Sequence, residues 1–306
     1  MRVITFDIET VPDLNGINYR DYQYLRFRGK RDKSEEEFVK EFSLNPFTLF
    51  IISASGVYIE EGNITRGFVL FISDNRNTPS VNREFYAEGK SLEIDYRPIT
   101  ADFVEDKLYE LEEELLRRFW ERIEDANFLV SFNGYSFDGY ILRLRSMIHG
   151  IDMPMHLLKD ERIHIDLMKF LSDGEREKRY KLDFICRKFG IHTPKDMIDG
   201  SKVADEFYKR NYLNVAMYNL KDSIALAQLY LKLKKYVEQR YVSLSEDPFT
   251  DKQFHKLKAI LKKLVSTDEE TLKLAMKKHI GKKSISELIN ILERVEKEIS
   301  REDIPF

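Results

Sequence analysis

The amino-acid sequence predicts an α/β domain with a mixed central β-sheet flanked by helices, followed by a small helical module at the C-terminal end. Three observations support this class. Strand patterns dominate the first third of the chain, strands and amphipathic helices alternate in the middle, and the last part holds helical patterns alone. The expected domains are residues 1–242 and residues 249–306, and the polar segment between them ends at Pro248.

The strands are predicted from alternating or continuous apolar residues. The first is β-rich from the second residue and ends before Pro12, and the second and third are joined by a turn at Gly62-Asn63. Two later apolar runs are shorter and are typical of buried strands. The expected strands are residues 2–8, 48–59, 64–73, a short piece near 84–86, 127–132 and 163–167, and the remainder of 74–100 is expected to be a loop.

The helices are predicted from capping residues and from apolar residues at a spacing of three or four. Ser34 is a candidate N-cap, and Glu37 would complete a capping box. Leu108, Leu111 and Leu115 begin an apolar stripe. The expected helices of the first domain are residues 34–42, 106–124, 137–148, 181–189, 201–210 and 214–241, and those of the C-terminal module are 251–265, 267–279 and 284–299.

The composition excludes several classes of protein. A hydrophobic content of 42% is sufficient for a sizeable core, and the single cysteine, Cys186, excludes a disulfide framework. The chain begins directly with a strand pattern and has no apolar run of about 18 residues, so we expect a soluble, cytoplasmic protein. The histidines lack zinc-binding spacing, and the glycines form no phosphate-binding loop.

Charge is divided unevenly along the chain. Residues 249–306 hold 13 Lys+Arg and 10 Asp+Glu, a net charge of +3, and the rest holds 37 and 43, a net charge of −6. The basic residues of the expected tail helices fit a surface that contacts phosphate backbones or docks a partner. They also fit an ordinary solvated helix face, so the role of the tail stays open.

Acidic residues occur in three short motifs. Asp7 and Glu9 are two positions apart on the first expected strand, so both carboxylates leave the same face. Asp138 begins a helix after a turn at Asn133, where the helix N-terminus favours a carboxylate. Converging carboxylates require cations, and oxygen ligands suit divalent metals. A metal-dependent enzyme that cleaves phosphodiesters is therefore the first hypothesis.

The third motif places Tyr218 and Asp222 four positions apart on one helix, so they share a face. Each motif alone has a simpler interpretation. Asp7 and Glu9 could end a strand in solvent, and Asp138 could be an ordinary residue at a helix start. Asp222 could pair with a Lys or Arg, and Tyr218 could be a core aromatic with its hydroxyl at the rim. Only the metal-site hypothesis accounts for the order, spacing and local structure of all three motifs.

The three motifs resemble those of the DEDD superfamily of 3′-5′ exonucleases. The matching residues are Asp7 and Glu9 in the first motif, Asn133, Phe137 and Asp138 in the second, and Tyr218 and Asp222 in the third. Met217 stands where the His branch of the superfamily has its histidine, so the chain resembles the Tyr (DEDDy) branch. Residues 1–240 are similar to the proofreading exonuclease domain of family B DNA polymerases and its free-standing relatives, which implies a ribonuclease H-like fold. The segments around Asp166, Asp183 and Gly200 add to the similarity.

The resemblance also implies a set of ligands and roles. Two divalent ions, Mg²⁺ or Mn²⁺, would bind, one held by Asp7, Glu9 and Asp222 and the other by Asp7 with Asp138. Tyr218 would orient the attacking water, because a phenol with a pKa of about 10 is a poor base at neutral pH. The implied contacts to the terminal nucleotide are Thr10, Asn133 and Phe137.

From this resemblance we expect an enzyme that hydrolyses single-stranded or unpaired 3′ ends of DNA to nucleoside 5′-monophosphates, in DNA repair or replication. A repair or replication protein is an expected partner, reached through the C-terminal module. An enzyme that trims the 3′ ends of RNA is the alternative within the same chemistry. A catalytically silent scaffold that binds nucleic acid is the alternative from another class.

Overall fold

The computed structural model describes residues 2–28, 34–74, 85–87, 89–154, 158, 163–172, 180–191 and 200–246. The chain divides into two compact units, Met1–Tyr241 and Val242–Phe306. The helices expected in residues 249–306 lie outside the described residues. The C-terminal helical module and the domain boundaries therefore stay predictions.

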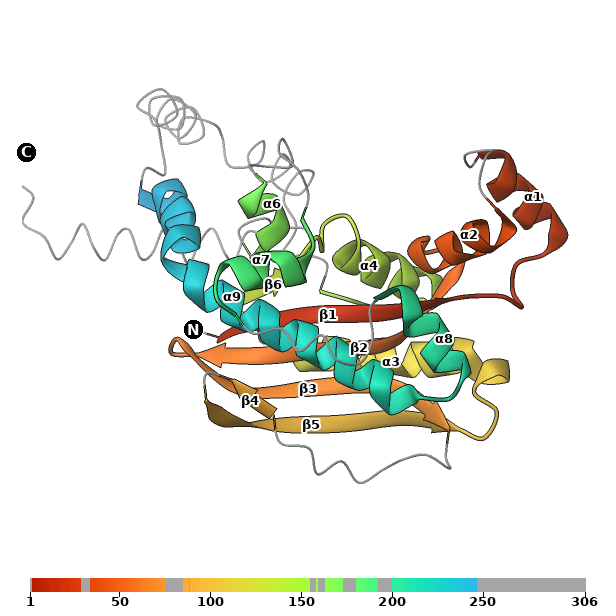
Figure 1. The fold of residues 1–306 in the computed structure, drawn as a ribbon, viewed down its shortest axis with the longest axis horizontal. Coiled ribbons are helices and arrows are strands. Elements are labelled where there is room, and N and C mark those ends of the chain that lie inside the picture. The colour runs from red at the N-terminus through yellow and green to blue at the C-terminus, as the bar shows by residue number, and fades with distance from the viewer. Residues whose placement is uncertain are drawn as a thin grey trace, which may run out of the picture. The chain divides into compact units, whose positions relative to one another are not determined.

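The first unit is built on a seven-stranded sheet in the order β4-β5-β3-β2-β1-β6-β7 (Figure 1). The strands are β1 (Arg2–Pro12), β2 (Leu49–Glu60), β3 (Asn63–Asp74), β4 (Phe85–Ala87), β5 (Lys90–Ala101), β6 (Phe128–Ser131) and β7 (His164–Asp166). β2 is antiparallel to β1 and β3, whereas β6 runs parallel to both β1 and β7. This mixed sheet, with helices on its faces, confirms the expected ribonuclease H-like class.

Helices cover both faces of the sheet (Figure 1). They are α1 (Tyr19–Arg28), α2 (Glu35–Lys40), α3 (Leu108–Ile123), α4 (Asp138–Ile148), α6 (Leu167–Leu171), α7 (Leu182–Lys188), α8 (Val203–Tyr208) and α9 (Tyr212–Glu246). Successive residues of β1 show the two faces. The Thr5 hydroxyl donates to the Ser223 carbonyl of α9 at 3.0 Å, and the Phe6 ring lies 6.0 Å from the Phe119 ring of α3. Odd-numbered residues of β1 therefore face α9, and even-numbered residues face α3.

Local sequence signals account for several boundaries. Ser34 and Glu37 form the expected capping box at the start of α2. Leu111 and Leu115 lie on the buried stripe of α3, as the spacing predicts. The turn between β2 and β3 lies at Glu61 and Gly62, one residue before the expected Gly62-Asn63, because Asn63 already begins β3; their φ values of 52° and 80° are a left-handed conformation that suits a tight hairpin.

β5 shows that the loop expected over residues 74–100 was wrong for residues 90–100, which form a strand. Leu92 and Ile99 are buried, but Glu93 and Arg97 are exposed. β5 pairs with β3 along most of its length, whereas the described part of β4 pairs with only its first three residues. A strand with little cover on one edge tolerates charged residues and a proline such as Pro98, and these obscure the alternation in the sequence.

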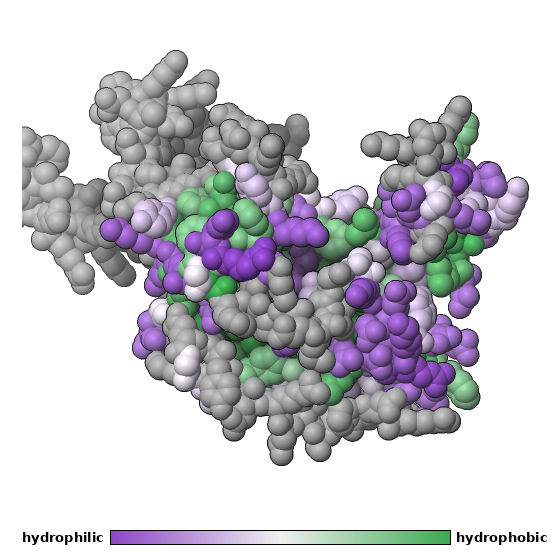
Figure 2. All heavy atoms as spheres, viewed as in Figure 1, coloured by the Kyte–Doolittle hydropathy of each residue, from purple (hydrophilic) through white to green (hydrophobic). Residues whose placement is uncertain are grey.

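The helix α1 was also missed, because its sequence carries no continuous apolar stripe. Tyr22 anchors it, with its ring 5.3 Å from the ring of Phe38 at the α2 side. Tyr19 and Phe27 are exposed. Together α1 and α2 form an arm beyond the C-terminal end of β1 (Figure 1), and its surface mixes hydrophilic with hydrophobic side chains (Figure 2).

Among the described helices, none combines the length and the apolar character that a membrane span requires.

Candidate active site

Three carboxylates converge where β1 passes under α9. Asp7 and Glu9 point from β1 to the α9 face, and Asp222 comes from α9 itself. One oxygen of each residue lies within 4.8 Å of one oxygen of the other two. The strand supplies two ligand positions because side chains two apart share a face, and the helix supplies the third. The structure thus brings together three of the four carboxylates predicted from the sequence.

The fourth carboxylate, Asp138, lies at the first turn of α4 and is 4% exposed. Its Oδ1 accepts the backbone N–H of Ile8 at 3.4 Å. β6 pairs with β1 only from Val3 to Thr5, so at Ile8 that side of β1 has no partner strand. Asp138 takes up this N–H and is thereby held beside β1, next to the group of three but not within it.

Tyr218 lies one turn before Asp222 on α9, and the two side chains are hydrogen-bonded. Burial, followed by the charges of Asp222, Glu9 and Asp7, raises the pKa of the Tyr218 phenol far above its ordinary value. The hydroxyl therefore remains protonated at neutral pH. A Cβ added to Gly200 would lie 3.6 Å from the Tyr218 oxygen, so the backbone at Gly200 passes close to the phenol.

The site carries negative charge that the fold does not balance. Burial and the neighbouring carboxylates raise the pKa of Asp7 and of Glu9. Burial raises the pKa of Asp138 to about 7 and that of Asp222 to about 6. Among the described residues, no Lys or Arg forms an ion pair with any of the four. A cluster of partly or fully buried carboxylate oxygens of this kind fits hard divalent cations such as Mg²⁺ or Mn²⁺.

A buried polar network, which the sequence analysis missed, fixes Asp7 against α9. The fully buried Asn219 donates from Nδ2 to Asp7 Oδ2 at 2.6 Å. The Ser53 hydroxyl donates to Asn219 Oδ1 at 2.9 Å, and the Ser55 hydroxyl donates to the Asn219 carbonyl at 3.0 Å. A signal existed in the sequence: Asn219 interrupts an apolar helix, and the serines are two apart on a strand of otherwise apolar residues.

The turn that leads to Asp138 is shaped by Asn133 and Asp166. Asn133 has a φ of 71°, its N–H donates to Asp166 Oδ1 at 2.9 Å, and its carbonyl accepts the N–H of Phe137. Asp166 also accepts the N–H of Tyr135 and caps α6. Asn133 Oδ1 is buried without a hydrogen-bond partner among the described residues. The backbone of Asn133 shapes the turn, and a role of its side chain in binding a nucleotide stays a prediction.

Two glycines allow this turn to pack closely. A Cβ on Gly134 would lie 2.1 Å from Ser131 Oγ, and one on Gly139 would lie 2.9 Å from the Gly134 carbonyl oxygen. Either contact is too short for a real side chain, so only glycine lets α4 begin so near the end of β6. That close approach sets the position of Asp138.

Thr10 and Phe137, the other predicted substrate contacts, have structural partners. The Thr10 hydroxyl donates to the Ser43 carbonyl at 2.6 Å, and Thr10 is 8% exposed. Phe137 is half-buried at the N-cap position of α4 and packs against the core. Contacts of Thr10, Asn133 and Phe137 with a nucleotide stay predictions.

Comparison with known proteins identifies a family. The profile of a family described as predicted 3′-5′ exonuclease related to the exonuclease domain of PolB matches residues 99–279, more than half of the chain. This stretch contains the second and third motifs. The match begins after β1, so it does not include Asp7 and Glu9. Only the fold brings these two residues next to Asp222, which lies in the matched stretch.

Individual relatives are more distant. An uncharacterized protein of Methanocaldococcus jannaschii is 34% identical over 104 residues, 33% of this chain and 57% of that protein. A DNA polymerase of the same organism is 25% identical over 175 residues, 52% of this chain and 10% of the polymerase. The structure of the family B DNA polymerase of Pyrobaculum calidifontis aligns at 18% identity with a TM-score of 0.44, covering 76% of this chain and 24% of that one. The chain thus spans only part of the length of each relative.

Proposed function

The chain belongs to the family of predicted 3′-5′ exonucleases related to the exonuclease domain of PolB, and we propose that it is a metal-dependent enzyme acting on DNA. It removes nucleotides from single-stranded or unpaired 3′ ends and releases nucleoside 5′-monophosphates. A role in DNA repair or replication follows from such a substrate.

One observation carries the proposal. Three half-buried carboxylates, Asp7, Glu9 and Asp222, place oxygens within 4.8 Å of one another, and no cation of the described residues forms an ion pair with them. Carboxylates at this separation repel strongly unless protons or metal ions neutralise them. A purely structural role would be served better by apolar residues or by paired charges.

The four acidic residues have distinct tasks in this proposal. Asp7, Glu9 and Asp222 would hold one divalent ion, and Asp7 with Asp138 would hold a second. Such ions lower the pKa of the attacking water and neutralise charge on the phosphate and on the leaving oxygen. Asn219 fixes the orientation of Asp7 through its 2.6 Å hydrogen bond.

Tyr218 positions the attacking water and does not remove its proton, because its raised pKa keeps the phenol neutral. The oxygen of this water forms a bond to the terminal phosphorus and gives up a proton to solvent. The bond from phosphorus to the 3′ oxygen of the preceding nucleotide breaks, and that oxygen takes up a proton to become a 3′-hydroxyl. The products are a nucleoside 5′-monophosphate and a strand shorter by one nucleotide.

DNA is the proposed substrate because both the family description and one relative refer to a DNA polymerase. The same site could cut an RNA backbone, so the choice has to be tested directly. A time course with Mg²⁺ or Mn²⁺ on matched single-stranded DNA, paired duplex, mismatched duplex and RNA would decide. The proposal expects fastest release from single-stranded and mismatched DNA ends, and faster loss of RNA would favour an RNA-trimming enzyme.

The catalytic assignment is tested with Asp7→Ala and Asp222→Ala in the full chain. Each should lower the rate by at least about a thousandfold, as expected when one member of a catalytic unit is removed. Glu113→Ala is the matched control, because Glu113 is an acidic residue on α3 whose carboxylate forms an ion pair with Arg117. If either site variant keeps its activity, the assignment is wrong. If the wild type binds DNA tightly but cleaves nothing with metal present, the silent scaffold becomes the better description.

A further inference from the structure

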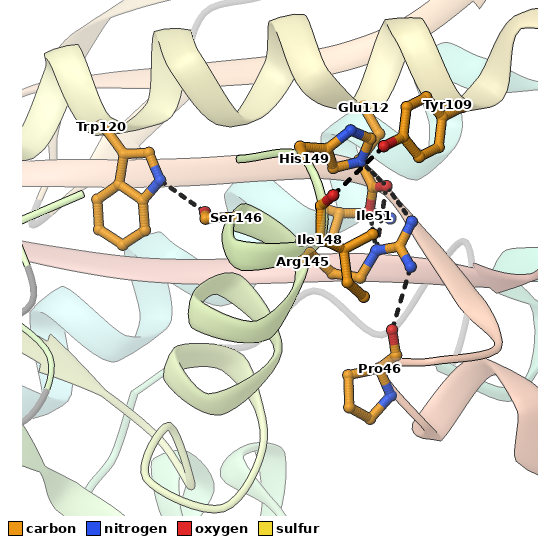
Figure 3. Close-up of polar contacts among 9 residues, drawn as sticks. All are labelled: Pro46, Ile51, Tyr109, Glu112, Trp120, Arg145, Ser146, Ile148 and His149. Carbon is orange, nitrogen blue, oxygen red and sulfur yellow. Dashed lines mark hydrogen bonds and ion pairs between the residues drawn. The ribbon is translucent and has the colours of Figure 1, made fainter. Parts of the chain in front are cut away.

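A second buried carboxylate lies on the other face of the sheet, in the contact between α3 and α4 (Figure 3). Glu112 is fully buried, and its carboxylate pairs with Arg145, which is 5% exposed. Arg145 Nε lies 2.9 Å from Glu112 Oε1, and His149 Nε2 lies 2.7 Å from Glu112 Oε2. We call Glu112, Arg145 and His149 the α3–α4 cluster. It contains its own cation and needs none from outside.

The α3–α4 cluster also holds the backbone of β2. The N–H of Ile51 donates to Glu112 Oε1 at 2.8 Å, and Arg145 Nη1 donates to the Pro46 carbonyl at 3.1 Å. Figure 3 shows both contacts. A contact that merely joined two helices would not reach the strand. The cluster therefore fixes the segment that enters β2.

That segment contains an irregularity in the pairing of β1 with β2. Glu9 lies opposite Ser53, but the next residue, Thr10, lies opposite Ile51, so Ile52 has no partner in the register. This is a β-bulge, and bulges increase the local twist and redirect the neighbouring side chains. Directly opposite residues point to the same side of a sheet. The slip therefore places residues 49–51 of β2 on the opposite faces from those they would have in a regular pairing.

The bulge begins directly after Glu9, one of the three converging carboxylates. Glu9 is the last residue of β1 that keeps the regular register on the α9 face, where Ser53 opposite it holds Asn219. If the bulge relaxed toward regular pairing, the twist of β1 at Glu9 would change. The Glu9 carboxylate would then leave its place beside Asp7 and Asp222.

We infer that Glu112, held by Arg145 and His149, is a positioning residue for the metal site: it fixes the bulge in β2 through the Ile51 amide and so sets the direction of Glu9. This inference rests on the proposed function for the identity of the site, but it concerns residues that touch neither metal nor nucleic acid. Partners that support metal ligands in this way commonly change metal affinity or activity by about 10- to 100-fold when they are lost.

Two double variants isolate the contact with Ile51. Both replace Arg145 by Met, so that neither leaves an unpaired buried cation. Glu112→Gln/Arg145→Met retains a side-chain oxygen for the Ile51 N–H, whereas Glu112→Leu/Arg145→Met has a side chain of similar size without an acceptor. Binding of Mn²⁺ alone is measured by calorimetry, together with kcat and KM on a single-stranded DNA oligonucleotide.

The Leu variant should bind Mn²⁺ about tenfold more weakly than the Gln variant, with kcat lowered and KM for DNA unchanged. Equal Mn²⁺ affinity in the two folded variants would overturn the inference. If the Leu variant does not fold, Arg145→Lys decides instead, because lysine cannot pair with Glu112 and reach Pro46 together. It should weaken Mn²⁺ binding several-fold, and unchanged affinity would overturn the inference equally.

Ser146→Ala is the matched control, because Trp120 Nε1 donates to Ser146 Oγ at 2.9 Å between the same two helices without touching β2 (Figure 3). It should lower thermal stability and leave Mn²⁺ affinity unchanged. A comparable loss of affinity would show that any loosening of the two helices has this effect, against the inference. If the wild type binds Mn²⁺ but degrades no nucleic acid, the proposed function fails, while the Mn²⁺ affinities still test the role of Glu112.

Discussion

Carboxylates lie between the sheet and its helices on both faces, and the fold treats them in opposite ways. On the α9 face, Asp7, Glu9 and Asp222 converge, and no Lys or Arg in the described part of the chain forms an ion pair with them. On the α3 face, Glu112 is fully buried, whereas those three are half-buried, and Arg145 and His149 lie against it. Glu112 has its own cation in Arg145, whereas no ion pair to a described Lys or Arg compensates the other three carboxylates.

The difference shows that the presence or absence of a partner charge for a carboxylate inside the fold indicates whether its role is structural or functional. A buried ion pair with all its hydrogen bonds made is compatible with a purely structural role. Carboxylates that face one another without a partner cation do not serve such a role well, because their repulsion must be removed by protons or by metal ions. Burial first, and then the charges of the neighbouring carboxylates, raise the pKa of Asp7 and of Glu9.

The largest expected effect tests the balanced side of the comparison. Glu112→Gln should lower the free energy of unfolding by about 3–5 kcal/mol, because it leaves Arg145 buried without a partner charge. Urea denaturation of the full chain measures it. The companion variant Glu112→Gln/Arg145→Met should recover much of the loss. A decrease below about 1 kcal/mol would mean that water or another group replaces the ion pair.

A smaller change in the free energy of unfolding, on the order of 2 kcal/mol, is expected from Asp138 when the pH is raised in the absence of metal. Folding raises the pKa of Asp138 to about 7, above its unfolded value near 4. The folded state therefore holds a proton that the unfolded state has lost. Stability from this group is fully present below about pH 4 and is lost as the pH rises through about 7.

The measurement compares wild type with Asp138→Asn at pH 5 and pH 8, in EDTA and in Mn²⁺. The comparison with the Asn variant cancels titrations elsewhere, including that of the buried His164, whose pKa is lowered. In EDTA, wild type should lose more stability than the variant as the pH rises, and Mn²⁺ should remove the difference. The same pH dependence in both proteins would contradict the raised pKa of Asp138.

The smallest expected effect is an increase in stability, whereas the change at Glu112 is expected to lower it. Asp222→Asn should stabilise the metal-free protein at pH 8 by about 1 kcal/mol, because it removes one charge from a cluster of like charges. Thermal unfolding in EDTA measures the change. Lower stability in EDTA would show that Asp222 has a cationic partner and that the site is balanced after all.

Much of this architecture could be predicted locally. The capping box at Ser34 and the apolar stripe of α3 depend on neighbours along the chain, and both occur as expected. β5 was missed because its charged residues are tolerated only by its place near the edge of the sheet. The helix α1 was missed because its anchoring contact, between Tyr22 and Phe38, joins separate helices.

The residues of the candidate site also divide into those that the sequence predicted and those that it did not. Motif spacing alone selected Asp7, Glu9, Asp138, Tyr218 and Asp222, because the periods of strands and helices dictate which residues share a face. It did not reveal Asn219 or Glu112. Asn219 acts on Asp7 across 212 positions, and Glu112 reaches Ile51 across 61.

The sequence by itself determined the class of fold and the acidic residues that define the site, because both are written in short periodic patterns. Only the tertiary structure decided how those residues are held. It set the slip between β1 and β2 after Glu9, the carboxylate that holds the Ile51 amide and the absence of a cation among the described neighbours of Asp7. These features depend on which distant segments pack together. A carboxylate needs a partner charge only where packing has removed the water around it.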